Sequence, residues 1–109
     1  RQMPTFNDRE KAFEDKYKHD QDLQFRTEVR RNKLLGKWVA TELLGLEGDA
    51  VEAYAKDVVA SDLDEPGPDD VIRKIMADLQ AKGSDFSEHR LRHRMEELMA
   101  EAKQQIMQE

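Results

Sequence analysis

The sequence contains no cysteine, and it has only three prolines and five glycines among its 109 residues. The absence of cysteine excludes disulfide bonds, thiolate catalysis and cysteine-based metal sites. Aromatic residues make up 6% of the chain, so we expect a small core built mainly from aliphatic side chains. No apolar run approaches the roughly 18 residues that a membrane-spanning helix needs. The N-terminal residues also lack the apolar stretch of a secretory signal peptide.

Charged residues are abundant: they make up 39% of the chain, and the net charge is −6. The charge is unevenly distributed, because residues 1–45 carry ten basic and eight acidic side chains whereas residues 46–109 carry eight and sixteen. An acidic body disfavours nucleic acid as the main partner, since the phosphates would be repelled. The length is that of one domain with one hydrophobic core.

Apolar residues recur at helical spacing in four segments, at about residues 8–44, 50–62, 68–82 and 87–106, and strand patterns are almost absent. The short connections predict roughly antiparallel neighbours, and hence an all-α four-helix bundle with a long first helix. After the first segment, the predicted apolar faces consist of Val51, Tyr54, Ala55, Val58, Val59, Leu63, Val71, Ile72, Ile75, Met76, Leu79, Leu91, Met95, Leu98, Met99, Ala102 and Ile106.

Capping and terminating residues mark the ends of these segments. Asn7 and Asp49 are each followed three residues later by Glu, which is the pattern of a capping box. Gly83 is placed to end the third helix and Ser87 to cap the fourth. Gly36 lies inside the first helix, where Gly costs about 1 kcal/mol relative to Ala. Either a close approach of a neighbouring helix or partner explains this glycine, or it is a tolerated defect.

The apolar face of the first segment is interrupted near its middle. On a helical wheel, Phe6, Phe13 and Tyr17 lie within about 40° of one another. Leu23, Phe25 and Val29 point in other directions, so the aromatic stripe does not continue into the part that belongs to the bundle. We therefore divide the chain into a mobile N-terminal segment and a bundle.

The boundary of this division is placed between residues 1–18, the mobile segment, and residues 19–109, the four-helix bundle. Burial of three aromatic side chains contributes roughly 5–9 kcal/mol, whereas ordering about fourteen backbone residues costs on the order of 14 kcal/mol. The aromatic stripe alone therefore cannot hold the segment in place, and we expect it to fold against a partner. A simple extension of the first helix over the bundle agrees equally well with the residue pattern.

Candidate residues for chemistry are few. His89 and His93 have the i,i+4 spacing of a zinc site, but the Glu of the usual motif is replaced by Arg, so we favour a solvated basic face. Arg30, Arg31 and Lys33 form a dense basic cluster, which suits either nucleotide phosphates or a salt-bridged helix surface. Phosphate-binding glycine loops and nucleophile triads are absent from the sequence. We therefore expect neither an enzyme nor a metal site.

Four blocks of sequence together carry more information than any single motif. They are FNDREKAFE at 6–14, RRNKLLGKW at 30–38, AYAKDVV at 53–59 and DVIRKI at 70–75. Their residues, order and spacing resemble the zeta-type ATPase inhibitor subunits of α-proteobacteria, over nearly the whole chain. The resemblance implies a four-helix bundle with a mobile N-terminal inhibitory segment.

The resemblance also implies a partner, the catalytic head of the F-type ATP synthase with its α, β and γ subunits. The N-terminal segment would enter a catalytic αβ interface as a helix and block ATP hydrolysis. The implied contact residues are Thr5, Phe6, Asp8, Arg9, Glu10, Lys11, Phe13, Glu14, Lys16 and Tyr17. The protein would be cytoplasmic and would lie at the inner membrane only through the synthase, without inserting into the membrane.

Two alternatives stay open at this point. Some members of the family are reported to bind adenine nucleotides, which implies ADP or ATP as a ligand and Arg30, Arg31 and Lys33 as its candidate site. In that case the chain would be a nucleotide-binding regulatory module. The other alternative is a generic adaptor bundle for a different complex. No other cofactor is expected.

Overall fold

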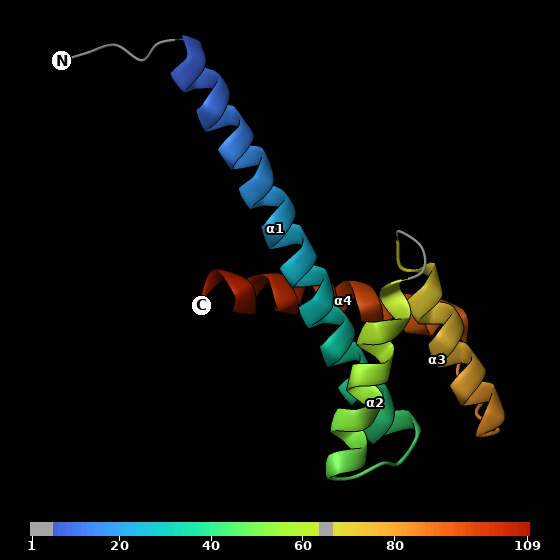
Figure 1. The fold of residues 1–109 in the computed structure, drawn as a ribbon. Helices are drawn as coiled ribbons and strands as arrows, with labels where there is room; N and C mark the ends of the chain where they lie inside the picture. The colour runs from blue at the N-terminus through green and yellow to red at the C-terminus, as the bar shows by residue number, and fades with distance from the viewer. Residues whose placement is uncertain (1–5, 64–66) are drawn as a thin grey trace.

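The structure is a computed structural model, which describes the backbone of residues 6–63 and 67–109 and the side chains of residues 18–62 and 67–109. Every regular element in these ranges is helical (Figure 1), which confirms the predicted all-α class with four helices and a long first helix. The α-helices are α1 (Phe6–Trp38), α2 (Asp49–Ala60), α3 (Asp69–Ala81) and α4 (Glu88–Met107). A π-helix, η1 (Val39–Leu43), extends α1, and a 3-10 turn, η2 (Ser61–Leu63), follows α2. Over the described ranges, no helix is both long and apolar enough to cross a membrane.

The starts of the helices agree only partly with the capping prediction. Ser87 caps α4 as expected, because its hydroxyl accepts a hydrogen bond from the Arg90 backbone N–H at 3.2 Å. The prediction for Asn7 is wrong, since α1 begins at Phe6 and already includes it. Asp49 is the first residue of α2 rather than its cap, and Gly48, with φ of +60°, takes the cap position without a side-chain hydrogen bond. The negative charge of the Asp49 carboxylate, in the first turn, still interacts favourably with the positive end of the helix dipole.

The end of α3 has the predicted glycine geometry. Gly83 has a φ of +82°, a conformation that L side chains rarely adopt. Its N–H donates to the Gln80 carbonyl at 3.0 Å, and the Ser84 N–H donates to the Leu79 carbonyl at 2.9 Å. These two bonds form a Schellman motif, which satisfies carbonyl groups that the helix leaves without partners.

The end of the first helix is wider than an ordinary α-helix. The Leu44 N–H donates to the Val39 carbonyl at 2.9 Å, and the Leu46 N–H donates to the Ala40 carbonyl at 2.8 Å. The first bond spans five residues, one more than in an α-helix, which is the signature of the π-helix η1, and the second bond closes a still wider turn. Gly45, with φ of +67°, then ends the helix at the predicted place.

The helices α1 and α2 run antiparallel and pack directly on each other. Asn32 pairs with Asp62 and Lys37 pairs with Glu52, so residue numbers rise on one helix as they fall on the other. In Figure 1, α3 returns alongside α2, and α4 crosses α1, with which it is in contact. The N-terminal half of α1 extends beyond the other helices, and the principal extents are 67 × 26 × 21 Å.

One face of each helix contributes to a single hydrophobic core. Its buried apolar residues are Leu35, Val39, Ala40, Leu44, Ala55, Val58, Val71, Ile72, Ile75, Leu79, Leu91, Met95, Leu98, Ala102 and Ile106. The predicted apolar faces of α2, α3 and α4 all point to this core, although Val51, Tyr54, Val59, Met76 and Met99 are only half-buried. The Leu63 side chain lies outside the described residues. Between α2 and α3, the Tyr54 hydroxyl donates to Asp78 Oδ2 at 2.8 Å.

Gly36 marks the closest approach of α1 and α2. A methyl group at this position would lie 2.8 Å from the Cα of Ala55 and 3.2 Å from the Cβ of Val58. Real Cβ atoms essentially never approach a backbone atom to 2.8 Å, so only glycine fits without a shift of the helices. The first of the two explanations for this glycine, a neighbouring helix, is therefore correct.

A buried polar group joins α1 to η2, the turn that follows α2. The fully buried Asn32 donates through Nδ2 to Asp62 Oδ2 and accepts at Oδ1 from Arg31 Nε, both at 3.0 Å. Burial raises the pKa of the Asp62 carboxyl, even though the Asn32 hydrogen bond and the Arg31 charge oppose the shift. Burial lowers the pKa of Arg31, against the charges of Glu28 and Asp62. These hydrogen bonds orient α1 against η2, but they leave the charged groups of Asp62 and Arg31 poorly hydrated.

Substitution of Gly36 by Ala should destabilise the protein. Overpacking typically costs 1–3 kcal/mol, and the better helix propensity of Ala returns about 1 kcal/mol. Because the obstructing atom belongs to the backbone of Ala55, we expect a net loss of about 1–2 kcal/mol in the free energy of unfolding, measured with urea. A gain in stability would contradict the close approach.

Substitution of Asp62 by Asn should stabilise the protein at neutral pH. Since the pKa of Asp62 is raised in the folded state, this carboxyl favours folding while it is protonated. That contribution is lost as the pH rises through the raised pKa. The difference in unfolding free energy between D62N and the wild type should therefore increase in favour of D62N from pH 3 to pH 7. A pH-independent difference would show that Asp62 titrates normally.

Candidate functional site

The predicted partner-binding segment forms the projecting end of α1. The helix continues without a break from the bundle to Phe6, and residues 6–22 correspond to about 25 Å of helix. Thr5 lies outside the described residues, and so do the side chains of the other predicted contact residues, from Phe6 to Tyr17. Their contacts, and the mobility of residues 1–18, therefore stay predictions.

The described part of α1 shows where the helix joins the bundle. Residues 18–22 all have exposed side chains, and the first buried side chain among those described is Thr27. Its hydroxyl donates to the Leu23 carbonyl at 2.6 Å. Leu23 and Thr27 line a cavity together with Met99 and Ile106 of α4. The described part of α1 thus meets α4 at Leu23 and Thr27, and the division at residue 18 stays a prediction.

The C-terminus of α4 is fastened to α1 just beyond this junction. Arg26 Nη2 lies 3.1 Å from Glu109 Oε2, and Arg30 Nη2 pairs with the other oxygen of the same carboxylate. Arg30 Nη1 also donates to Gln105 Oε1 at 2.9 Å. The hydrogen bond from Arg30, and the charges of both arginines, lower the pKa of Glu109. These contacts support the part of α1 from which the projecting half emerges.

The predicted basic cluster is divided between two environments. Arg31 is 8% exposed, and its guanidinium contacts Asn32 Oδ1 at 3.0 Å and Met99 Sδ at 4.0 Å. Arg30 and Lys33 instead line a cavity that Arg31 does not reach. The structure therefore does not bring the three side chains to one phosphate-sized position. Nucleotide binding by this cluster stays an untested prediction.

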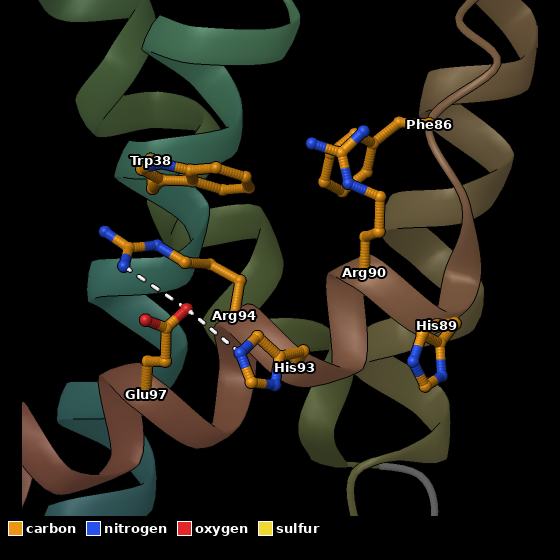
Figure 2. Close-up of a pocket in the computed structure, with 7 residues that line it drawn as sticks. All are labelled: Trp38, Phe86, His89, Arg90, His93, Arg94 and Glu97. Carbon is orange, nitrogen blue, oxygen red and sulfur yellow. Dashed lines mark ion pairs between the residues drawn. The ribbon is translucent and has the colours of Figure 1, made fainter.

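A different constellation lies where α1 meets the start of α4. Figure 2 shows Trp38 of α1 and Phe86 of the α3–α4 connection, with ring centroids 5.8 Å apart. Each ring carries an arginine from α4: the Arg90 guanidinium lies 4.5 Å from the Phe86 centroid, and that of Arg94 lies 5.2 Å from the Trp38 centroid. Stacking of this kind holds the flat guanidinium group in place by cation–π attraction.

Two histidines and one acid complete the lining of this cavity. Figure 2 shows His89, His93 and Glu97 on α4, with the Glu97 carboxylate 3.6 Å from Arg94 Nη1 and 3.9 Å from His93 Nε2. In the part of the chain that the structure describes, no three His, Asp or Glu side chains gather as metal ligands. The basic face could be predicted from the sequence, whereas its aromatic partner Trp38 could not, because it comes from a helix about fifty residues earlier.

Comparisons with known proteins cover almost the whole chain. A family model described as "ATPase inhibitor subunit zeta" matches residues 3–105. A solved structure, determined by solution NMR, is 49% identical in sequence and superposes with a TM-score of 0.70. This similarity covers 79% of the present chain and 96% of the other. No curated protein matches the chain.

The junction geometry predicts a gradient of hydrogen exchange along α1. Backbone amides of residues 18–22 have no side-chain cover, whereas those around Leu35 lie in the core. We expect residues 18–22 to exchange at least about tenfold faster than residues 32–38, because local opening there breaks few packed contacts. Exchange measured residue by residue by NMR tests this. Equal protection along the helix would mean that α1 is covered further towards its N-terminus.

Proposed function

Because the chain belongs to the ATPase inhibitor subunit zeta family, we propose that it inhibits ATP hydrolysis by the catalytic head of the F-type ATP synthase. The family consists of regulators rather than enzymes, and its model spans residues 3–105, which includes both the projecting half of α1 and the bundle. The similarity to a structure at 49% identity supports the same fold for the bundle. The chain thus acts on its target by binding alone.

The observation that carries the mechanism is the unbroken course of α1. The helix leaves the bundle near Leu23 and continues to Phe6, beyond the other helices. A single projecting helix can enter a groove between two subunits, as amphipathic helices do in many helix-in-groove complexes. We propose that this end inserts at a catalytic αβ interface near γ and blocks rotation in the direction of hydrolysis.

Within the inserted segment, aromatic and charged residues would have different roles. Phe6, Phe13 and Tyr17 share one face by their spacing and would supply apolar anchors in the groove. The remaining residues of the segment would make polar contacts to the α, β and γ subunits, and they are Thr5, Asp8, Arg9, Glu10, Lys11, Glu14 and Lys16. Charged pairs at the rim of an interface contribute more to orientation than to affinity.

The bundle would serve as the holder of this helix. Its packing at Gly36 and its ion pairs to Glu109 fix the direction in which α1 leaves the bundle. A fixed helix axis lowers the entropy that is lost on insertion, which favours binding. The protein would then reside in the cytoplasm at the inner membrane, held there by the synthase.

Removal of residues 1–18 should abolish inhibition and leave the bundle folded. The measurement is ATP hydrolysis by a purified synthase head without its own inhibitor, titrated with the full chain and with the shortened chain. We expect loss of hydrolysis with the full chain only. Far-UV circular dichroism and urea unfolding of the shortened chain show whether its bundle is intact. Full inhibition by an intact shortened bundle would contradict the insertion mechanism.

An aromatic control sharpens this test. Substitution of Phe6, Phe13 and Tyr17 together by Ala should weaken inhibition by at least tenfold, because interface aromatics often contribute more than about 1.4 kcal/mol each. Phe25 is 63% exposed and lies on another face of the same helix, so Phe25→Ala should leave inhibition unchanged. If the full chain does not affect hydrolysis at all, the synthase is not the target, and the adaptor alternative takes its place.

A further inference from the structure

A hollow of about 320 Å³ lies in the angle between the projecting half of α1 and the last turns of α4. Leu23 of α1 and Met99, Ile106 and Met107 of α4 form its apolar lining. In Figure 1, α4 crosses α1 below the projecting half, and its C-terminal end leads away to one side. The ion pairs to Glu109 hold the two helices together at this crossing.

The lining of this hollow is apolar and open to a partner. Met107 is 78% exposed, and Leu23 and Met99 are half-buried. The Thr27 hydroxyl, which also lines the hollow, already donates to the Leu23 carbonyl at 2.6 Å and needs no ligand. A single exposed apolar residue is common on a protein surface, but here it lies beside two others in a concave place. Because methionine side chains adapt readily to an apolar surface, the hollow suits an apolar side chain of a partner rather than an ion.

Charges of opposite sign flank the apolar lining. Asp20 lies on the α1 side of the hollow and Lys103 on the α4 side, and both side chains are exposed. Neither forms an ion pair with another described residue. A partner that places an acidic group beside Lys103 and a basic group beside Asp20 would be oriented by these charges.

The position of the hollow along α1 indicates what would occupy it. The α1 residues that line it fall within 20–27, directly after the segment 1–18 that is proposed to insert, and α1 runs unbroken from Phe6 through them. At a rise of about 1.5 Å per residue, residues 20–27 lie about 3–14 Å beyond residue 18. The last turns of α4 cross α1 at this level and form a shoulder beside the projecting half. A groove between subunits that admits α1 as far as residue 18 would therefore meet this shoulder with its rim.

We propose that the hollow is a second contact with the synthase head, an inference that rests on the proposed insertion of α1. The rim of the αβ interface places an apolar side chain against Leu23 and Met107, with an acidic group beside Lys103. The contact with α4 stops α1 at a defined depth, which insertion of a bare helix would not do. It also raises the affinity, because the second contact forms within an already joined complex, at a high effective concentration.

Variants on α4 separate this contact from insertion, because α4 is not part of the inserted segment. ATP hydrolysis by the synthase head is titrated with the full-length wild type and with K103Q/M107Q, which changes two exposed side chains and should fold normally in urea unfolding. We expect half-maximal inhibition at a concentration at least about tenfold higher. Maximal inhibition should be unchanged, because residues 1–18 are intact. Two controls should match the wild type: Phe25→Ala, which lines a different hollow, and Lys82→Gln, at an exposed lysine just after α3.

The outcomes distinguish the contact from the insertion. If the wild type inhibits and K103Q/M107Q inhibits equally well, the contact is excluded and the insertion stands. If the wild type does not inhibit at all, both fail. An equal loss in either control would show that the effect is not specific to the hollow and would also overturn the contact. Sedimentation of the free chain tests a second copy as the occupant, since a dimer that K103Q/M107Q abolishes would assign the hollow to self-association instead.

A cross-link tests the contact without reference to potency. The sequence has no cysteine, so Lys103→Cys introduces a single attachment point for a benzophenone label. At a saturating concentration, where hydrolysis is inhibited, we expect light to cross-link this variant to an α or β subunit of the head. The same label on Lys82→Cys should give no such product. Inhibition without a cross-link from position 103, or equal cross-linking from both positions, would overturn the proposal.

Discussion

The contact of Gly36 with Ala55 is the constraint on which the arrangement of helices depends. The backbones of α1 and α2 meet there without any intervening side chain, so the register between the two helices has little freedom. This register brings Asn32 within 3.0 Å of Asp62 and Lys37 within 3.2 Å of Glu52. A shift of either helix would break these contacts together. The polar group would then leave a buried amide and a buried charge without partners, which is costly.

Because α1 is fixed against α2, one helix can form part of the bundle and also the projecting segment. From Thr27 onward α1 has a buried face, and upstream of it the described side chains are exposed or only half-buried. An isolated helix in water is marginally stable, because its first turn is costly to form. The projecting half therefore depends on the turns of α1 that the bundle already holds in helical conformation. The ion pairs of Arg26 and Arg30 with Glu109 add a lateral support from α4. The bundle therefore sets both the direction and the helical register of the segment proposed to inhibit.

Local patterns in the sequence were sufficient to predict most of the fold. The apolar faces of α2, α3 and α4 and the ends at Gly83 and Ser87 follow from spacing and capping chemistry, because these signals lie within one or two turns. The π-helix after Trp38 was not predicted, because the apolar spacing of residues 39–43 is equally compatible with an α-helix. The cap at Asp49 failed for a similar reason, because Gly48 can take a conformation that moves the start of the helix.

The two basic groups show why charge in a sequence does not by itself locate a site. Arg30, Arg31 and Lys33 are adjacent in the chain, yet the helix directs Arg31 inward to Asn32, while Arg30 is held by Glu109. In α4, Arg92 lies on a different face of the helix from Arg90 and Arg94. Arg90 and Arg94 are one turn apart and share a face. Aromatic rings from α1 and from the α3–α4 connection then support both of them. The partners that the fold brings to each arginine, rather than the density of charge in the sequence, therefore decide where each cation lies.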